Sequence, residues 1–198
     1  HLDGIVKTFP GVRALDGVQF EVRRGECHAL MGENGAGKST LMKVVAGMYQ
    51  PDGGRIVIDG DEVTLPTPIA AKEHGVILIH QELSLAEDMS VAENIFLGEL
   101  PLKRFGFVDW KTLDDRVGGI LKMLNVDFGP RTKVSTLSIA KKQMVEIARA
   151  LTVDAKAVIF DEPTASLTDA EKVVLFDVIE DLKAQGVGIV YISHRMEE

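Results

Sequence analysis

The chain has 198 residues, a formal net charge of −8 and one cysteine. This length fits one domain, and a chain of this size buries a substantial core without disulfides. The acidic balance argues against non-specific binding to nucleic acid, which requires a surplus of Lys and Arg. Its apolar runs are too short to span a bilayer, and the apolar pattern expected of a signal peptide is not seen at His1-Leu2-Asp3, so we expect none here. The start at His1 without Met and the end at Glu198 suggest a piece of a longer polypeptide.

The first third of the chain predicts strands around a glycine-rich stretch. The segments Val18–Val22 and Cys27–Met31 predict two strands, which we expect to pair antiparallel with Cys27 buried. A helix is expected from about Lys38 to Gly47. Asp59 and Gly60 lie between two apolar runs, which predicts a β-hairpin.

The middle of the chain changes from a strand pattern to a helical one. The apolar run Val76–Ile79 predicts a short buried strand. From 82 to 153 helical spacing dominates, and Asp109 and Ser138 are expected N-caps of two helices. We therefore interpret this region as a helical insert.

The last part returns to strands. Ala157–Phe160 and Gly188–Ile192 predict two more buried strands. An amphipathic helix is expected between them at Asp169–Gln185, with Val173, Phe176, Ile179 and Leu182 on its inner face. The alternation of strands and helices favours an α/β fold.

One motif predicts a phosphate-binding loop. Glycines let the backbone wrap around phosphates, and the following helix directs the positive end of its dipole toward them. A lysine then supplies a positive charge and a serine hydroxyl binds Mg²⁺. The alternative is a chance glycine-rich turn. The motif consists of Gly32, Glu33, Asn34, Gly35, Ala36, Gly37, Lys38 and Ser39.

Three further features end predicted strands. Asp161 and Glu162 follow an apolar strand, where Asp161 would hold Mg²⁺ and Glu162 would accept a proton from water or orient it; the alternative is a surface turn. His194 could reach a γ-phosphate, or be structural or solvated. Gln81 could touch Mg²⁺ or water, or be an ordinary loop residue.

In this order, the motifs resemble those of the ATP-binding-cassette (ABC) ATPases. The glycine-rich loop resembles the Walker A motif and Val158–Glu162 the Walker B motif, while Gln81 and His194 resemble the Q-loop glutamine and the switch histidine. Other segments resemble the ATP-binding subunits of ribose-, galactose- and xylose-type importers, in particular the first of their two fused halves. Those segments are 8–16, 80–83, 91–98 and 191–196.

The resemblance implies a P-loop NTPase core with a mixed sheet and helices, an N-terminal antiparallel β-subdomain and a helical insert. We expect one ABC ATPase domain over 1–198, truncated at its C-terminus. Residues 1–81 and 154–198 would form the ATP-binding core, and 82–153 the helical subdomain.

The resemblance also assigns roles to individual residues. Phe9 would stack on adenine, although plain apolar packing is its alternative, and Thr40 would join the nucleotide contacts. Ser39, Gln81 and Asp161 would hold Mg²⁺, and Glu162, His194 and Gln81 would be catalytic. At the family's Leu-Ser-Gly-Gly-Gln signature this chain keeps Ser138 but has Ile139 and Ala140 in place of the glycines, which implies an asymmetric pair of sites.

The expected function is hydrolysis of ATP with Mg²⁺ to drive monosaccharide import. The expected partners are a second ABC ATPase half, a transmembrane permease and, indirectly, an extracytoplasmic sugar-binding protein. Nucleic acid is not expected. The location would be peripheral, at the cytoplasmic face of the membrane. The alternatives are a soluble ABC ATPase of DNA repair or translation, a non-hydrolysing nucleotide sensor and a small-molecule kinase.

Overall fold

A computed structural model describes residues 1–32, 35–80, 84–104, 106–164 and 167–193. The chain forms two compact units. The first comprises His1–His80, Ala155–Glu162 and Ile179–Glu198, and the second comprises Gln81–Asp154 and Pro163–Val178. The expectation that 1–81 and 154–198 bind nucleotide while 82–153 form a helical subdomain stays a prediction.

An antiparallel sheet opens the first unit. Phe9 pairs with Val12 across Pro10-Gly11, a turn in which Gly11 has a φ of 81°. The predicted hairpin is confirmed at Asp59 and Gly60, whose φ values of 54° and 93° suit a two-residue turn. The strand order is β2-β1-β4-β5. The strands are β1 (Leu2–Phe9), β2 (Val12–Phe20), β4 (Gly53–Ile58) and β5 (Asp61–Val63).

A second sheet of the first unit is parallel and has the order β3-β8-β7-β6. The expected antiparallel pairing of the two strands before the glycine-rich loop is wrong, because β3 pairs with β8 and β2 pairs with β1. Cys27 is exposed rather than buried, since β3 lies at the edge of the sheet. The strands are β3 (Cys27–Leu30), β6 (Val76–Ile79), β7 (Ala157–Asp161) and β8 (Gly188–Ile192).

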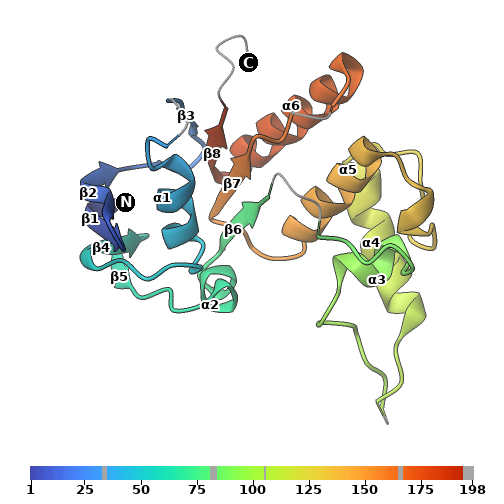
Figure 1. The fold of residues 1–198 in the computed structure, drawn as a ribbon. Coiled ribbons are helices and arrows are strands. Elements are labelled where there is room, and N and C mark those ends of the chain that lie inside the picture. Colours follow the sequence, from blue (N-terminus) through green and yellow to red (C-terminus); the bar gives the residue numbers. More distant parts are fainter. Residues whose placement is uncertain (33–34, 81–83, 105, 165–166, 194–198) are drawn as a thin grey trace. The chain divides into compact units, whose positions relative to one another are not determined.

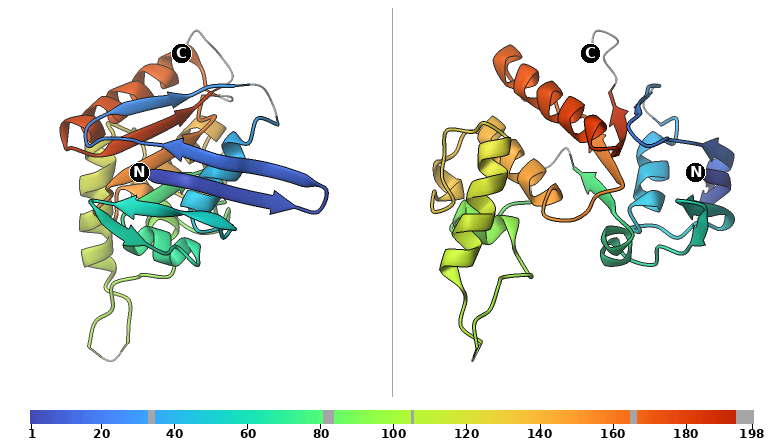
Figure 2. Two further views of the ribbon diagram at one scale, coloured as in Figure 1. Left: turned by 90° about the vertical axis from the view of Figure 1, so that its left-hand side faces the viewer. Right: turned by 180° about the vertical axis from the view of Figure 1, so that it is seen from behind.

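Helix α1 (Lys38–Val45) lies between the two sheets, as Figures 1 and 2 show. It buries Leu41, Met42 and Val44 in a core that contains residues of both sheets. The short helix α2 (Pro68–Glu73) precedes β6, and the Thr67 side chain caps it by accepting the Ala70 N–H. The position of α1 is therefore fixed by apolar contacts on both sides. The sheet residues of this core include Leu2, Ile5, Leu15, Ile56, Val76, Ile159, Val190 and Ile192.

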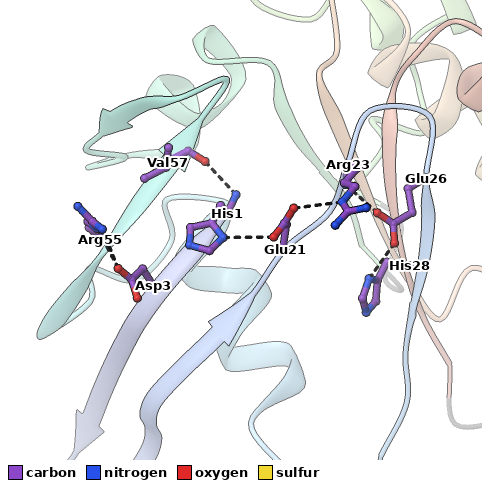
Figure 3. A network of polar contacts seen from close by, with 8 residues as sticks. All are labelled: His1, Asp3, Glu21, Arg23, Glu26, His28, Arg55 and Val57. Carbon is purple, nitrogen blue, oxygen red and sulfur yellow. Dashed lines mark hydrogen bonds and ion pairs between the residues drawn. The ribbon is translucent and has the colours of Figure 1, made fainter.

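A row of polar contacts follows the connection from β2 to β3 (Figure 3). The Arg23 Nε lies 3.3 Å from the Glu21 carboxylate, and the Arg23 N–H donates to Glu26 at 2.9 Å. That backbone hydrogen bond holds the pKa of Glu26 below its usual value. His1 and His28 flank the row, 3.8 Å from Glu21 and 3.4 Å from Glu26. Exposed pairs of this kind add little stability, so the row mainly fixes the entry into β3.

The second unit is helical. Asp109 and Ser138 are the N-caps of α4 and α5, as predicted, and Ser90 forms a capping box with Glu93 at the start of α3. Along α4 the buried residues recur every four positions, at Leu113, Val117 and Leu121. The elements are α3 (Val91–Ile95), α4 (Trp110–Met123), the 3₁₀ turn η1 (Val134–Thr136) and α5 (Ile139–Ala150).

Helix α6 (Asp169–Ala184) begins in the second unit and ends in the first. The expected inward position of Val173 is wrong, since this side chain is 60% exposed. The expected inward positions of Ile179 and Leu182 are confirmed, and Leu175 and Val178 complete the buried face. This spacing of three and four residues forms one continuous stripe that leaves Val173 outside it.

Candidate nucleotide-binding site

The start of α1 carries the glycine-rich loop. Gly37 is the N-cap in the left-handed conformation, with φ 89° and ψ −3°, and no side chain caps this helix. A Cβ at Gly37 would lie 2.8 Å from the Ala14 carbonyl oxygen, so both conformation and space require glycine. The first amides of α1 are therefore suited to an anionic ligand.

Two side chains of α1 belong to this loop. The Lys38 Nζ donates to the Gly32 carbonyl oxygen at 2.5 Å, which holds the ammonium group against the loop. Ser39 has an exposed side chain, and Thr40 is half-buried. Glu33 and Asn34 lie outside the described residues.

Asp161 lies at the carboxyl edge of the parallel sheet. Asp161 pairs with Ile192 of β8, and Ile192 also pairs with Leu30 of β3, the strand that leads into the glycine-rich loop. Only β8 therefore separates the end of β7 from the end of β3. Burial raises the pKa of Asp161, and the neighbouring Glu162 charge raises it further. His80, Lys43 and Lys38 lower the same pKa in part, which places positive charge near this carboxylate.

Glu162 has an unusual backbone. Its φ is 49°, in the left-handed region, and its N–H donates to the Ile192 carbonyl oxygen at 3.0 Å. A non-glycine residue there has a conformational cost and is often found at functional sites. Gln81 and His194, the other two residues expected to act in catalysis, lie outside the described residues.

Phe9, at the end of β1, is half-buried and contacts Tyr49. The two rings meet edge to face, with centroids 5.3 Å apart. The Lys7 ammonium lies 5.7 Å from the Phe9 centroid, and the Lys43 ammonium lies 5.9 Å from the Tyr49 centroid. Sequence reasoning missed Tyr49 and Lys43. The one available signal was their place on and just after α1, which carries the loop.

The signature residues lie in the second unit. Ser138 caps α5, because its Oγ accepts the Lys141 N–H at 3.3 Å. The Ile139 side chain is 58% exposed, whereas Ala140 is buried. In the described residues, no group of three or more His, Cys, Asp or Glu side chains is arranged to hold a metal.

A parallel sheet, a glycine-rich turn into a helix and carboxylates at the strand ends define the P-loop nucleotide-binding class. Within it, the family model described as "ABC transporter" matches residues 15–165. The chain belongs to the ABC transporter family.

Similar proteins support this assignment. A putative ribose/galactose/methyl galactoside import ATP-binding protein 2 of Burkholderia cenocepacia (strain HI2424) is 56% identical over the whole chain, which spans 39% of that protein's length. A nucleotide-free ATP-binding cassette from an ABC transporter is 30% identical, with a TM-score of 0.87 over 99% of this chain and 81% of that one. A dimeric bacterial ABC transporter cassette is 25% identical, with a TM-score of 0.82 over 99% and 88%. These similarities extend beyond the loop to the whole fold.

Proposed function

We propose that this chain binds ATP and Mg²⁺ at the carboxyl edge of its parallel sheet and hydrolyses ATP to drive sugar import. The start of α1 is the observation that carries this proposal. Gly37 leaves the helix without a side-chain cap, and Lys38 holds its ammonium group 2.5 Å from Gly32 O. Amides and an ammonium group at one helix start suit the β- and γ-phosphates of a nucleotide.

The nucleotide contacts of the proposal extend from the loop to β1. Backbone amides of residues 32–37 would surround the phosphates, and Thr40 would add a hydroxyl. Phe9 would stack on the adenine. Its partly exposed ring, braced by Tyr49, is compatible with a stacking role.

The residues present fit a magnesium ion. Ser39 offers an exposed hydroxyl, and Asp161 is a half-buried carboxylate whose pKa is raised by burial, so a nearby cation would offset its charge. Gln81 is the third expected ligand. When bound, Mg²⁺ would supply positive charge that stabilises the phosphates during transfer.

Glu162 is the proposed general base. Its carboxylate would accept a proton from the attacking water or orient that water for in-line attack on the γ-phosphate. His194 would stabilise charge at the same phosphate. The positive φ of Glu162 supports this assignment, because strained residues are concentrated at functional sites.

The proposed partner for the signature residues is a second ATPase half. Ser138, with the neighbouring backbone, would meet a nucleotide bound by that half. Ile139 adds an exposed side chain where the family signature has glycine. This bulk supports the proposed asymmetry, in which this chain's own loop is the competent site.

Sugar import is proposed from the relatives. The B. cenocepacia relative is named for ribose, galactose and methyl galactoside import. We propose that the protein works with a transmembrane permease and, through it, an extracytoplasmic sugar-binding protein. It would lie at the cytoplasmic face of the membrane as a peripheral subunit. No helix in the described ranges is long and apolar enough to cross a membrane. A soluble ABC ATPase of DNA repair or translation is the less supported alternative.

The ATPase proposal is tested by separating binding from turnover. Glu162→Gln is expected to keep ATP affinity and to lower kcat about 10²–10⁴-fold, since it removes the base. Lys38→Ala is expected to lose tight binding. Glu180→Gln is the matched control, because this acid pairs with Lys183 on the exposed face of α6. Unchanged turnover in Glu162→Gln would reject the assigned base.

The transport proposal is tested by isolating the full-length protein from membranes in mild detergent. A polytopic permease that co-purifies, together with sugar uptake that is lost in Glu162→Gln, is the expected result. A full-length protein recovered with ribosomes or DNA would move the function to the alternative.

A further inference from the structure

Tyr49 follows the end of α1 in a turn that the helix itself fixes. Gly47, the residue after the C-cap, has a left-handed φ of 71°. The Met48 N–H donates to the Lys43 carbonyl oxygen at 2.8 Å, and the Tyr49 N–H donates to the same oxygen at 3.1 Å. A left-handed glycine followed by such a hydrogen bond closes a helix as a Schellman motif. The backbone of Tyr49 is therefore held by the helix that begins at Lys38.

Asp52 ties the turn after α1 to β1. Its carboxylate accepts the Thr8 N–H at 2.7 Å and lies 2.9 Å from the Lys7 ammonium, while its own N–H donates to the Val6 carbonyl oxygen at 2.8 Å. The hydrogen bonds from Lys7 and Thr8 hold the pKa of Asp52 below its usual value, so this carboxylate is charged at neutral pH. Phe9 follows Thr8 directly, so the end of β1 that carries Phe9 is fixed to the turn after α1.

The rings of Phe9 and Tyr49 meet between these two anchors. Their centroids are 5.3 Å apart and their planes lie at 73°, an edge-to-face geometry that is attractive beyond the burial of the rings. The Tyr49 ring also packs against the core of the first unit, and the Lys43 ammonium lies 5.9 Å from its centroid. Tyr49 is therefore the fixed member of the pair, and its contact restricts how the Phe9 ring can turn.

We propose that Tyr49 is a positioning residue of the nucleotide site, which holds the Phe9 ring in the orientation that stacks on adenine. This inference rests on the proposed function, because it needs Phe9 to bind the base. A ring that is already ordered loses less conformational freedom when its ligand binds, which raises affinity. Tyr49 touches no part of the nucleotide in this proposal, so its loss weakens the hold on the base and leaves the hold on the phosphates unchanged.

The first experiment measures the affinities of the full-length protein for ATP and for tripolyphosphate, which lacks a base. Tyr49→Leu is expected to weaken ATP binding about 3–10-fold, with tripolyphosphate affinity within about twofold of wild type. Tyr49→Phe keeps the ring and should bind ATP within about twofold of wild type. An unchanged ATP affinity in Tyr49→Leu, or an equal loss for ATP and tripolyphosphate, would overturn the proposal.

Met48→Ala is the matched control. It truncates the preceding side chain, which is 44% exposed, without removing a ring, and should change neither affinity by more than about twofold. A loss of ATP affinity in Met48→Ala as large as that in Tyr49→Leu would also overturn the proposal, because it would assign the effect to the turn and not to the ring.

A double-mutant cycle separates positioning from general destabilisation. Phe9→Ala alone is expected to weaken ATP binding about 5–100-fold. In that background Tyr49→Leu should weaken it no further, because its effect passes through Phe9. A loss of the same size in both backgrounds would overturn the inference. If Tyr49→Leu does not fold, Tyr49→Met takes its place in the cycle.

The same measurements distinguish failure of this inference from failure of the proposed function. A wild-type protein that binds no ATP would reject both together. An unchanged ATP affinity in Phe9→Ala would reject the stacking role of Phe9 and this inference, and would leave the phosphate site at α1 standing. A wild type that binds ATP through Phe9, with an additive cycle, would reject the inference alone.

Discussion

Two helices that carry nucleotide-related motifs begin in opposite ways. Helix α1 starts at Gly37 and has no side-chain cap, while α5 starts at Ser138, whose hydroxyl accepts the Lys141 N–H. Ser138 already satisfies one of the donors at the start of α5. At α1 no side chain takes that role, which leaves it to water or to a ligand. The difference is consistent with the anion site that we propose at α1, whereas the first turn of α5 is already stabilised by its own Ser138 side chain.

The largest effect is expected from a substitution at Gly37, the N-cap of α1. Gly37→Ala places a Cβ 2.8 Å from the Ala14 carbonyl oxygen at a φ of 89°, which combines strain with a backbone clash. We expect a loss of about 2–4 kcal/mol in the free energy of unfolding and a weaker ATP affinity. Urea denaturation and nucleotide titration measure the two effects.

Gly35→Ala is the matched control for that change. Gly35 has a similar φ of 86°, but nothing lies within 4 Å of the position of its Cβ. It should lose only the conformational part, about 1–2 kcal/mol. Equal losses at Gly35 and Gly37 would show that the clash with Ala14 is unimportant.

An intermediate effect is expected on the α5 side. Ser138→Ala removes the cap and should cost about 1 kcal/mol of stability, measured by urea denaturation. Nucleotide affinity at the α1 loop should not change. Ile139→Ala, at a side chain that is 58% exposed, serves as the control and should remain within about 0.5 kcal/mol. An Ser138→Ala protein as stable as wild type would mean that the 3.3 Å contact to Lys141 contributes nothing.

The smallest effect is expected from the charge of Asp161, and it is measured as a change in melting temperature. Burial raises the pKa of Asp161 above the ordinary value of 3.8, so the folded state holds the proton more tightly than the unfolded chain. Stability from this group therefore falls as pH rises from 3.8 through the raised pKa, and it stays reduced at neutral pH. Asp161→Asn should raise the melting temperature of the nucleotide-free protein at pH 7.

Asp59 provides the opposite case for the same measurement. Hydrogen bonds from Lys156 and Arg24 hold the pKa of Asp59 below its usual value. Its contribution is present above 3.8 and is lost as pH falls through the lowered pKa. Asp59→Asn should therefore lower the melting temperature at pH 7. A shift of the same sign for both variants would contradict the role of burial at Asp161.

Local chemistry made parts of the fold predictable. Val76–Ile79 and Gly188–Ile192 have the predicted bounds, because short apolar runs beside glycine leave few alternatives to buried strands. Asp109 and Ser138 were correct caps because capping depends on neighbouring residues. The glycine-rich loop was predicted from its motif spacing, and Asp161 and Glu162 from their position after an apolar strand. The structure confirms the helix after the loop and the strand before the carboxylates, while the roles of these residues stay predictions.

Non-local pairing accounts for what the sequence did not reveal. Strand β1 was not predicted, because its polar residues hide a strand that is defined by its neighbours β2 and β4. The partner of β3 is β8, more than 150 residues later, and no local pattern indicates that pairing. Tyr49 beside Phe9 and Glu146 beside Ser84 are likewise contacts that only the folded chain brings together.

The backbone conformation of Glu162 bears on how the stability of this protein could be increased. Glycine adopts a left-handed φ of 49° without steric strain, whereas glutamate does not. Glu162→Gly should therefore raise the free energy of unfolding by about 1 kcal/mol or more. The same replacement would remove the carboxylate at the end of β7. Under the catalytic role that we propose for Glu162, selection for thermal stability would favour this replacement and selection for activity would reject it. The stability of the fold and the turnover number would then place opposite demands on one residue.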